Sequence, residues 1–132
     1  MNNKLDGYNL YSQPSKSLAG GVALYISDSL NHSERSDLNY IYDEFEAIWI
    51  EIKNVKDENI LCSCVYRHPS SHPKKLTEYF ESVFSKISHE NKLIYIMGDF
   101  NINLLDSDKH FETNEFLNTL NANFFLPYIL QP

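Results

Sequence analysis

Polar side chains follow two strand-like apolar runs of the sequence, at the point where each run ends. Tyr66 and Arg67 close the first run, and Asp99 and Asn101 follow the second, just after Gly98. A carboxylate and an amide two residues apart at the end of a strand point the same way, toward the edge where open α/β sheets bind ligands. Asp can orient or deprotonate a water and hold a divalent cation, whereas Asn can donate to a phosphate oxygen. Tyr66 and Arg67 also carry donors that suit phosphate, so they are candidate phosphate contacts.

Each of these patterns also has a simpler structural explanation. Asp99 and Asn101 fit an ordinary turn in which a side chain bonds its own backbone, and Tyr66 and Arg67 fit a half-buried ring and a solvated cation. The histidines show no metal-ligand spacing and are interpreted as surface or loop residues: His32, His68, His72, His89 and His110. The sequence shows no Gly-rich phosphate loop and no nucleophile elbow.

The first half of the chain reads as a series of strands. Gly20-Gly21 opens a buried strand over 22–27, and the polar stretch 27–39 is predicted to be a surface connection. A strand with one firmly buried face is predicted over 45–52 and another strand over 60–66. The short turn between these two strands favours antiparallel pairing.

The second half combines helices with one further strand. Apolar residues from Leu76 to Ile87 recur with helical spacing, which predicts an amphipathic helix over 74–90. The short apolar run 93–97 predicts a strand buried on both faces, and a second amphipathic helix is expected over 113–123. This order of strand pairs followed by helix, strand and helix is typical of a layered α/β fold.

Composition and charge limit the possible classes of protein. The 132 residues are 42% hydrophobic and 14% aromatic, which is enough for one packed domain or part of one. Eleven Lys and Arg against eighteen Asp and Glu give a net charge of −7, without a basic stripe. Such a chain does not hold nucleic acid by phosphate neutralisation alone. If it meets DNA, a metal ion or further sequence must contribute.

The cysteine pair and the chain ends indicate the setting of the protein. Cys62 and Cys64 point to the same face of a strand and are expected to be reduced, since no second Cys pair completes a four-ligand metal site. Reduced cysteines indicate an intracellular compartment. We expect no membrane association, because no apolar stretch is long enough to span a bilayer. Both ends of the sequence look abrupt, which predicts a fragment.

Four blocks of the sequence together resemble a known family. They are 20–26 (GGVALYI), 45–52 (FEAIWIEI), 65–70 (VYRHPS) and 95–103 (YIMGDFNIN). In this order they are similar to the endonuclease/exonuclease/phosphatase superfamily, in particular to the apurinic-type endonuclease domain of LINE-type, non-LTR retrotransposons. The resemblance implies an α/β fold, a four-layer α/β sandwich, present here as one partial domain over 1–132 that is incomplete at both ends.

The resemblance also implies a chemistry and a role for each residue. Members hydrolyse phosphodiesters with Mg²⁺ or Mn²⁺ and need no small-molecule cofactor. The matching residues are Asp99, which activates the attacking water, Asn101, which contacts the phosphate, and Tyr66, which donates to a phosphate oxygen. Asp99 and Asn101 are also candidate metal ligands in such a site. To these catalytic residues we add Arg67 as a substrate contact.

The implied biological role is the nicking of DNA for target-primed reverse transcription. The partners would then be DNA and a reverse transcriptase domain of the same polyprotein, acting in the nucleus. His68 and Ser70 depart from the usual loop after the tyrosine, and the family's upstream Glu and downstream Asp and His have no match here. We therefore expect the chain to be inactive by itself. Two alternatives are a degenerate, non-catalytic binding or structural module and a phosphoester hydrolase of the same superfamily that acts on a phosphoinositide or sphingolipid.

Overall fold

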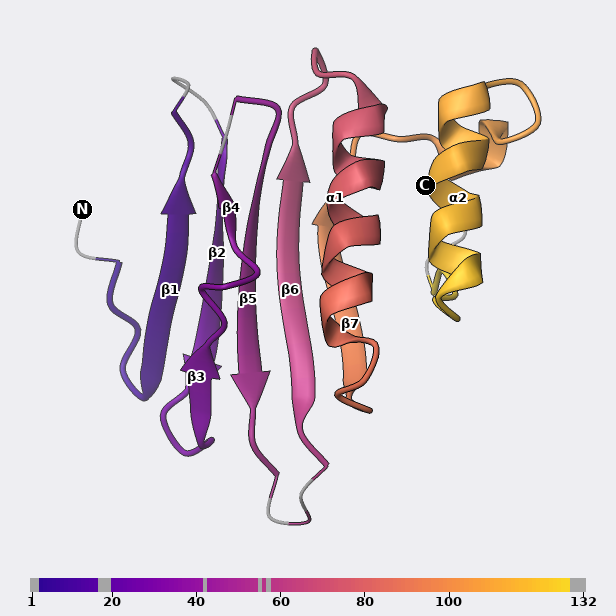
Figure 1. The fold of residues 1–132 in the computed structure, drawn as a ribbon. Coiled ribbons are helices and arrows are strands. Elements are labelled where there is room, and N and C mark those ends of the chain that lie inside the picture. The colour runs from indigo at the N-terminus through magenta and orange to yellow at the C-terminus, as the bar shows by residue number, and fades with distance from the viewer. Residues whose placement is uncertain (1–2, 17–19, 42, 55, 57, 129–132) are drawn as a thin grey trace.

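The computed structural model describes residues 3–16, 20–41, 43–54, 56 and 58–128, with strands first and helices later along the chain (Figure 1). In chain order its elements are β1 (Tyr8–Pro14), β2 (Gly21–Ser27), β3 (His32–Glu34), β4 (Tyr40–Ile41), β5 (Phe45–Ile52), β6 (Ile60–Arg67), α1 (Pro73–Ile87), β7 (Leu93–Asp99), the short 3-10 helix η1 (Leu104–Asp106) and α2 (Phe111–Ala122). The strands and both helices that the sequence predicts are present.

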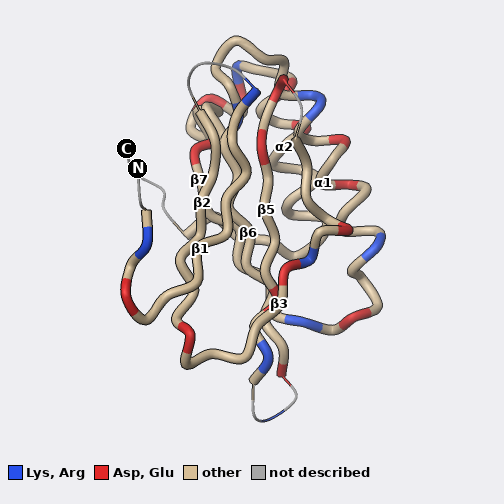
Figure 2. The backbone as a smooth tube through the Cα atoms, turned by 90° about the vertical axis from the view of Figure 1, so that its left-hand side faces the viewer, with Lys and Arg blue, Asp and Glu red and all other residues tan. Residues whose placement is uncertain are grey.

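The strands form two sheets that lie face to face. β1 and β2 pair antiparallel, and the larger sheet has the order β3-β5-β6-β7, with β4 also paired to β5. β5 and β6 are antiparallel, as expected, whereas β6 and β7 are parallel and α1 is the crossover between them. Figure 2 shows β1 and β2 on one side of the larger sheet and both helices on the other. The described residues thus form a helix layer and two sheet layers, which confirms the α/β fold class.

β5 lies at the centre of these layers and is buried on both faces. Phe45, Ala47 and Trp49 belong to the core shared with the helices, whereas Ile48 and Ile50 point to the opposite face, toward the smaller sheet. All five side chains have 0% exposure. The expectation of one buried face was therefore wrong, because a second sheet covers the face that alternation alone leaves open.

α1 packs on the larger sheet through the predicted apolar series. Its buried apolar residues are Leu76, Phe80, Val83, Phe84 and Ile87. Tyr79 links the helix to two other segments, because its hydroxyl accepts from Trp49 Nε1 at 2.8 Å and donates to the carbonyl oxygen of Leu38 at 2.5 Å. Burial raises the pKa of Tyr79, so the hydroxyl remains a donor.

β7 departs from the sequence prediction of a strand buried on both faces. Its residues facing the helices are half-buried, whereas Leu93, Tyr95 and Met97 on the other face are 58%, 51% and 48% exposed. This face of β7 is exposed because the smaller sheet has only two strands in the described part of the chain, and its strand β2 lies over β5 and β6. Neither helix in the described part of the chain has the length and apolar character needed to cross a lipid bilayer.

Some strands carry no signal in the sequence. β1 lies in a region where the sequence predicts no element, and β3 lies within the polar stretch predicted to be a surface connection. Both are largely exposed and owe their conformation to pairing, β1 with β2 and β3 with β5. Side-chain patterns do not reveal strands whose main stabilisation is a backbone ladder.

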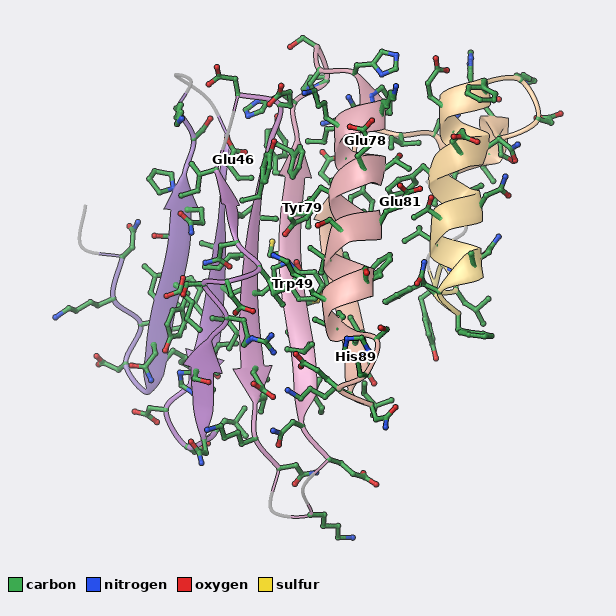
Figure 3. The ribbon with its side chains drawn as sticks, viewed as in Figure 1. Glu46, Trp49, Glu78, Tyr79, Glu81 and His89 are labelled. Atoms are coloured by element: carbon green, nitrogen blue, oxygen red, sulfur yellow. The ribbon has the colours of Figure 1, made fainter. Side chains whose placement is uncertain are left out.

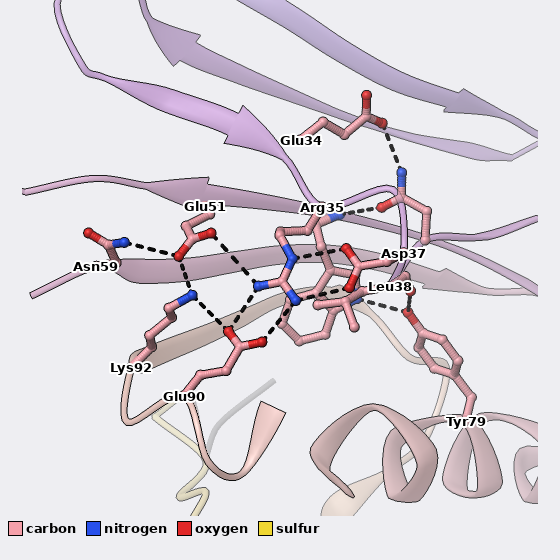
Figure 4. A network of polar contacts seen from close by, with 11 residues as sticks. Glu34, Arg35, Asp37, Leu38, Glu51, Asn59, Tyr79, Glu90 and Lys92 are labelled. Atoms are coloured by element: carbon pink, nitrogen blue, oxygen red, sulfur yellow. Dashed lines mark hydrogen bonds and ion pairs between the residues drawn. The ribbon is translucent and has the colours of Figure 1, made fainter. Parts of the chain in front are cut away.

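An ion-pair network joins the amino ends of β6 and β7 to the segment after β3 (Figure 4). The guanidinium of Arg35 donates to both oxygens of Asp37 at 2.9 Å and to both oxygens of Glu90 at 2.9 and 3.0 Å. Lys92 lies 2.7 Å from Glu90 and also pairs with Glu51. Hydrogen bonds from Arg35 lower the pKa of Glu90 from its ordinary 4.5 to about 2.

This network should make stability depend on pH in the acid range. Because the folded state lowers the pKa of Glu90, its contribution is complete above pH 4.5 and is lost as the pH falls toward about 2. We expect the free energy of unfolding of the wild type to fall by about 1–2 kcal/mol more than that of Glu90→Gln over this range, allowing for solvent screening. Urea unfolding at several pH values measures this. Glu78→Gln, which alters an exposed carboxylate of α1, is the control, and equal pH dependence of wild type and Glu90→Gln would contradict the assignment.

Candidate active site

Three side chains from neighbouring strands lie in one row at the carboxyl ends of β6 and β7. Tyr66 of β6 is the register partner of Asp99 in β7 and of Glu46 in β5. Register partners point to the same face of a sheet, so Glu46, Tyr66 and Asp99 form a row across three strands, here called the strand-end row. Gly20, just before β2, lies against the ring of Tyr66, which places the row on the face toward the smaller sheet. The sequence predicted two of its three members.

Gly98 allows β7 to approach β6 directly before Asp99. Its φ is +141°, and a Cβ built there would lie 1.8 Å from the carbonyl oxygen of Val65. Both the left-handed φ and this contact exclude any other residue without movement of the backbone. The glycine therefore determines how closely Asp99 lies to Tyr66.

Asp99 and Asn101 form a turn stabilised by their own side chains. The backbone N–H of Asn101 donates to Asp99 Oδ1 at 3.0 Å, and Asn101 Nδ2 donates to the carbonyl oxygen of Arg67 at 2.6 Å. Asn101 has a φ of +49°, a conformation that Asn tolerates better than most residues. The structural turn expected as an alternative is thus present. The turn uses one carboxylate oxygen of Asp99, and this residue remains exposed to solvent.

The structure corrects the role expected of Arg67. Its side chain points to the helix side of the sheet and is 4% exposed, so it is neither a solvated cation nor a group that faces the strand-end row. The guanidinium donates to backbone carbonyls of the loops after β6 and β7: Phe100 at 2.6 Å, Asn101 at 2.5 Å, His68 at 3.2 Å and Ser71. Burial lowers the pKa of Arg67, and the nearby Asp99 carboxylate opposes this effect. Arg67 therefore joins the two loops.

The structure adds a residue pair that sequence reasoning missed. Glu46 lies in β5 (Figure 3) and is fully buried. Its Oε1 lies 2.8 Å from Nε2 of His68, whose side chain is 12% exposed. His68 thus lies in a loop, which is one of the two positions expected for it, and its side chain is largely buried. The available signal was Glu46 itself, a charged residue among apolar ones on a strand face that is otherwise buried.

The oxygen atoms at the carboxyl ends of β6 and β7 are of the type that binds a hard divalent cation such as Mg²⁺. Mg²⁺ is held by one or two carboxylates together with waters and substrate phosphates, and Asp99 with the amide oxygen of Asn101 offers such donors. Within the part of the chain that the structure describes, no three His, Cys, Asp or Glu side chains gather into a metal-holding group. Cys62 and Cys64 are free, and burial raises the pKa of both thiols. Asp99 and Asn101 therefore fit part of a Mg²⁺ or Mn²⁺ site.

Comparison with protein-family models relates this geometry to known proteins. The model of the endonuclease/exonuclease/phosphatase family matches residues 2–128. The chain belongs to this family. No curated protein sequence matches the chain. Membership confirms the resemblance suggested by the four sequence blocks.

A solved structure shares the fold of this family member. It is the endonuclease domain of TRAS1, a telomere-specific non-LTR retrotransposon, with a TM-score of 0.67 and 14% sequence identity. The match covers 90% of this chain and 54% of that chain, so this chain spans about half the length of the retrotransposon domain. At this identity the likeness establishes the fold.

The close approach at Gly98 can be tested by stability. We expect Gly98→Ala to lower the free energy of unfolding by about 3 kcal/mol or more, because the added methyl meets a backbone carbonyl and φ is positive. Gly7→Ala is the matched control, since Gly7 has a φ of +80° with nothing within 4 Å of its Cβ position. It should cost about 1–2 kcal/mol. Equal losses in urea unfolding would argue against the contact with β6.

The role of Arg67 can be tested in the same way. Arg67→Met keeps the aliphatic stem and leaves buried carbonyls without donors, so we expect a loss of about 2–4 kcal/mol in unfolding free energy. Amide hydrogen exchange should also become faster in both loops. Lys75→Met, which removes an exposed cation from α1, should change stability by less than about 0.5 kcal/mol. Unchanged exchange at Asn101 in Arg67→Met would refute the joining role.

Proposed function

We propose that this domain carries part of the active site of a divalent-metal-dependent phosphodiesterase that nicks DNA. The observation that supports this most is the register pairing of Tyr66 with Asp99 at the carboxyl ends of two parallel strands, in a member of the endonuclease/exonuclease/phosphatase family. This edge is where open α/β sheets bind ligands. A phenol donor beside an exposed carboxylate suits a phosphate group attacked by water.

Each side chain then has a defined task. Asp99 orients the attacking water and accepts its proton, while Tyr66 donates to a non-bridging phosphate oxygen. Asn101 contacts the phosphate through the amide hydrogen that Arg67 does not use, and Arg67 positions both loops without touching the substrate. A bound Mg²⁺ or Mn²⁺, held in part by Asp99 and Asn101, supplies stabilisation of the charge that develops on the phosphate.

The setting proposed for this activity follows the retrotransposon domain with the same fold. There an endonuclease belongs to a non-LTR retrotransposon. We infer that this chain acts on nuclear DNA next to a reverse transcriptase domain of the same polyprotein and provides the primer for reverse transcription. Lys and Arg are interspersed with Asp and Glu along the described backbone (Figure 2), and the net charge is −7. DNA binding by this chain alone should be weak and sensitive to salt.

A nicking assay on supercoiled plasmid with Mg²⁺ tests the proposal. It compares this chain with a form extended at both ends by the flanking coding sequence, because the present residues supply at most two metal donors. We expect the extended form to nick, the shorter chain to be silent, and Asp99→Ala in the extended form to lower the rate by about 10²- to 10⁴-fold. Asp108→Ala, an exposed carboxylate in the loop before α2, should keep the wild-type rate.

Other outcomes identify the alternatives. An extended form that is folded but does not nick refutes the endonuclease proposal. If that form hydrolyses a phosphoinositide in vesicles, with loss of activity in Asp99→Ala, the site acts on another phosphoester. If it hydrolyses neither substrate, the domain is a binding or structural module that keeps the family fold.

A further inference from the structure

Glu46 is a buried carboxylate to which the proposed chemistry gives no task. It lies in β5 between Phe45 and Ala47 with 0% exposure, and its Oε1 lies 2.8 Å from His68 Nε2. Its Oε2 is also buried and has no hydrogen-bond partner among the described residues. A buried carboxylate oxygen without a hydrogen-bond partner costs free energy on folding. Stability therefore does not explain a glutamate at this position.

His68, the partner of Glu46, touches the tyrosine of the strand-end row. The rings of His68 and Tyr66 meet edge to face, with centroids 5.0 Å apart and an interplanar angle of 82°. The backbone of His68 is held as well, because its N–H donates to the carbonyl oxygen of Glu44 at 3.0 Å and its carbonyl oxygen accepts from Arg67 at 3.2 Å. The backbone of His68 is therefore held in place, and its imidazole is oriented by the hydrogen bond with Glu46.

Gly20 brings the smaller sheet against both rings. It has a φ of +118°, and a Cβ at this position would lie 2.8 Å from His68 Cε1 and 3.1 Å from Tyr66 Cε1. The backbone before β2 therefore packs directly on the two rings. Tyr66 is confined by His68 and by Gly20, which leaves its ring little freedom to rotate about χ1.

We propose that Glu46 and His68 are positioning residues for Tyr66. Glu46 holds the imidazole by the hydrogen bond to Nε2, and the imidazole holds the phenol ring, so that the hydroxyl keeps one position relative to Asp99. A donor fixed in advance stabilises charge without reorganisation at the moment of reaction. This inference rests on the proposed function, in which Tyr66 donates to the phosphate.

The first test follows the ring of Tyr66 by NMR in the 132-residue chain with ¹³C-labelled tyrosine. Glu46→Leu removes the acceptor and the unpartnered oxygen, so the fold should be retained, and His68→Leu removes the ring contact. We expect the Tyr66 ring signals to shift and broaden in both variants and to stay in place in Glu46→Gln, which keeps an oxygen acceptor. Ser63→Ala is the control, since Ser63 carries the other buried oxygen without a partner among the described residues and lies on the opposite face of β6. Unchanged Tyr66 signals in folded Glu46→Leu and His68→Leu would overturn the inference.

The second test is a double-mutant cycle in the extended, nicking form. We expect Glu46→Leu to lower kcat by about 10- to 100-fold, with KM changed by less than about twofold. In the Tyr66→Phe background the same substitution should have an effect below about twofold, because the hydroxyl that it positions is already absent. Equal losses in both backgrounds would assign Glu46 a general structural role and overturn the inference.

The two tests separate this inference from the function on which it rests. If the extended wild type is folded and does not nick, the proposed function fails, while the NMR comparison still decides whether Glu46 and His68 fix Tyr66. If the extended form nicks and the Tyr66 signals do not respond to Glu46→Leu, the function stands and the positioning inference fails.

Discussion

A single buried guanidinium holds together the two loops on which the candidate site depends. Among the described residues Arg67 forms no ion pair within 4 Å, and its guanidinium donates instead to backbone carbonyls of the loops that follow β6 and β7. The planar fork of arginine suits this arrangement, because its five N–H groups reach several carbonyl dipoles at once. Asn101 returns a hydrogen bond to the carbonyl oxygen of Arg67 itself. The loops therefore form one unit, which holds Asn101 beside the carboxyl end of β6.

The charges around this unit explain why a cation belongs to the proposed chemistry. Glu46 and Asp99 flank Tyr66 in the strand-end row, while the buried Arg67 points to the opposite side of the sheet. A phosphodiester is an anion, so a row that carries carboxylates disfavours its approach unless a positive charge intervenes. The chain as a whole is also acidic, with a net charge of −7. In the proposed function, a divalent cation held in part by Asp99 and Asn101 would reconcile this electrostatic environment with a phosphate substrate.

Among the described residues, the smaller sheet covers only part of the larger sheet. One face of β7 carries an exposed apolar stripe, formed by Leu93, Tyr95 and Met97. The stripe is exposed because β2, in the smaller sheet, lies over β5 and β6. Exposed apolar stripes of this kind are typical of surfaces that another element or partner covers. The match to this chain covers 54% of the retrotransposon domain with the same fold. The stripe and the strand-end row lie on the same face of β7, so whatever covers the stripe also borders the candidate site.

Local patterns in the sequence determined the order of the main elements and the residues with suitable chemistry. The helical spacing from Leu76 to Ile87 predicted α1, and the Gly98-Asp99 block predicted polar groups at the end of a strand. Both signals are local, because periodicity and turn chemistry are properties of short segments. The sequence did not reveal β1 and β3, whose conformation comes from backbone pairing.

Only the tertiary structure decided how the polar residues are used. It buried Arg67 among carbonyls, paired Glu46 with His68 and left one face of β7 open. Each of these outcomes depends on which elements lie across a sheet or over its face. The sequence around a residue shows its chemistry. The partners that assign its role can lie more than 20 positions away, as for Glu46 with His68 and Arg67 with Asn101. For this reason the sequence identified the candidate groups, and the packing of the layers assigned their roles.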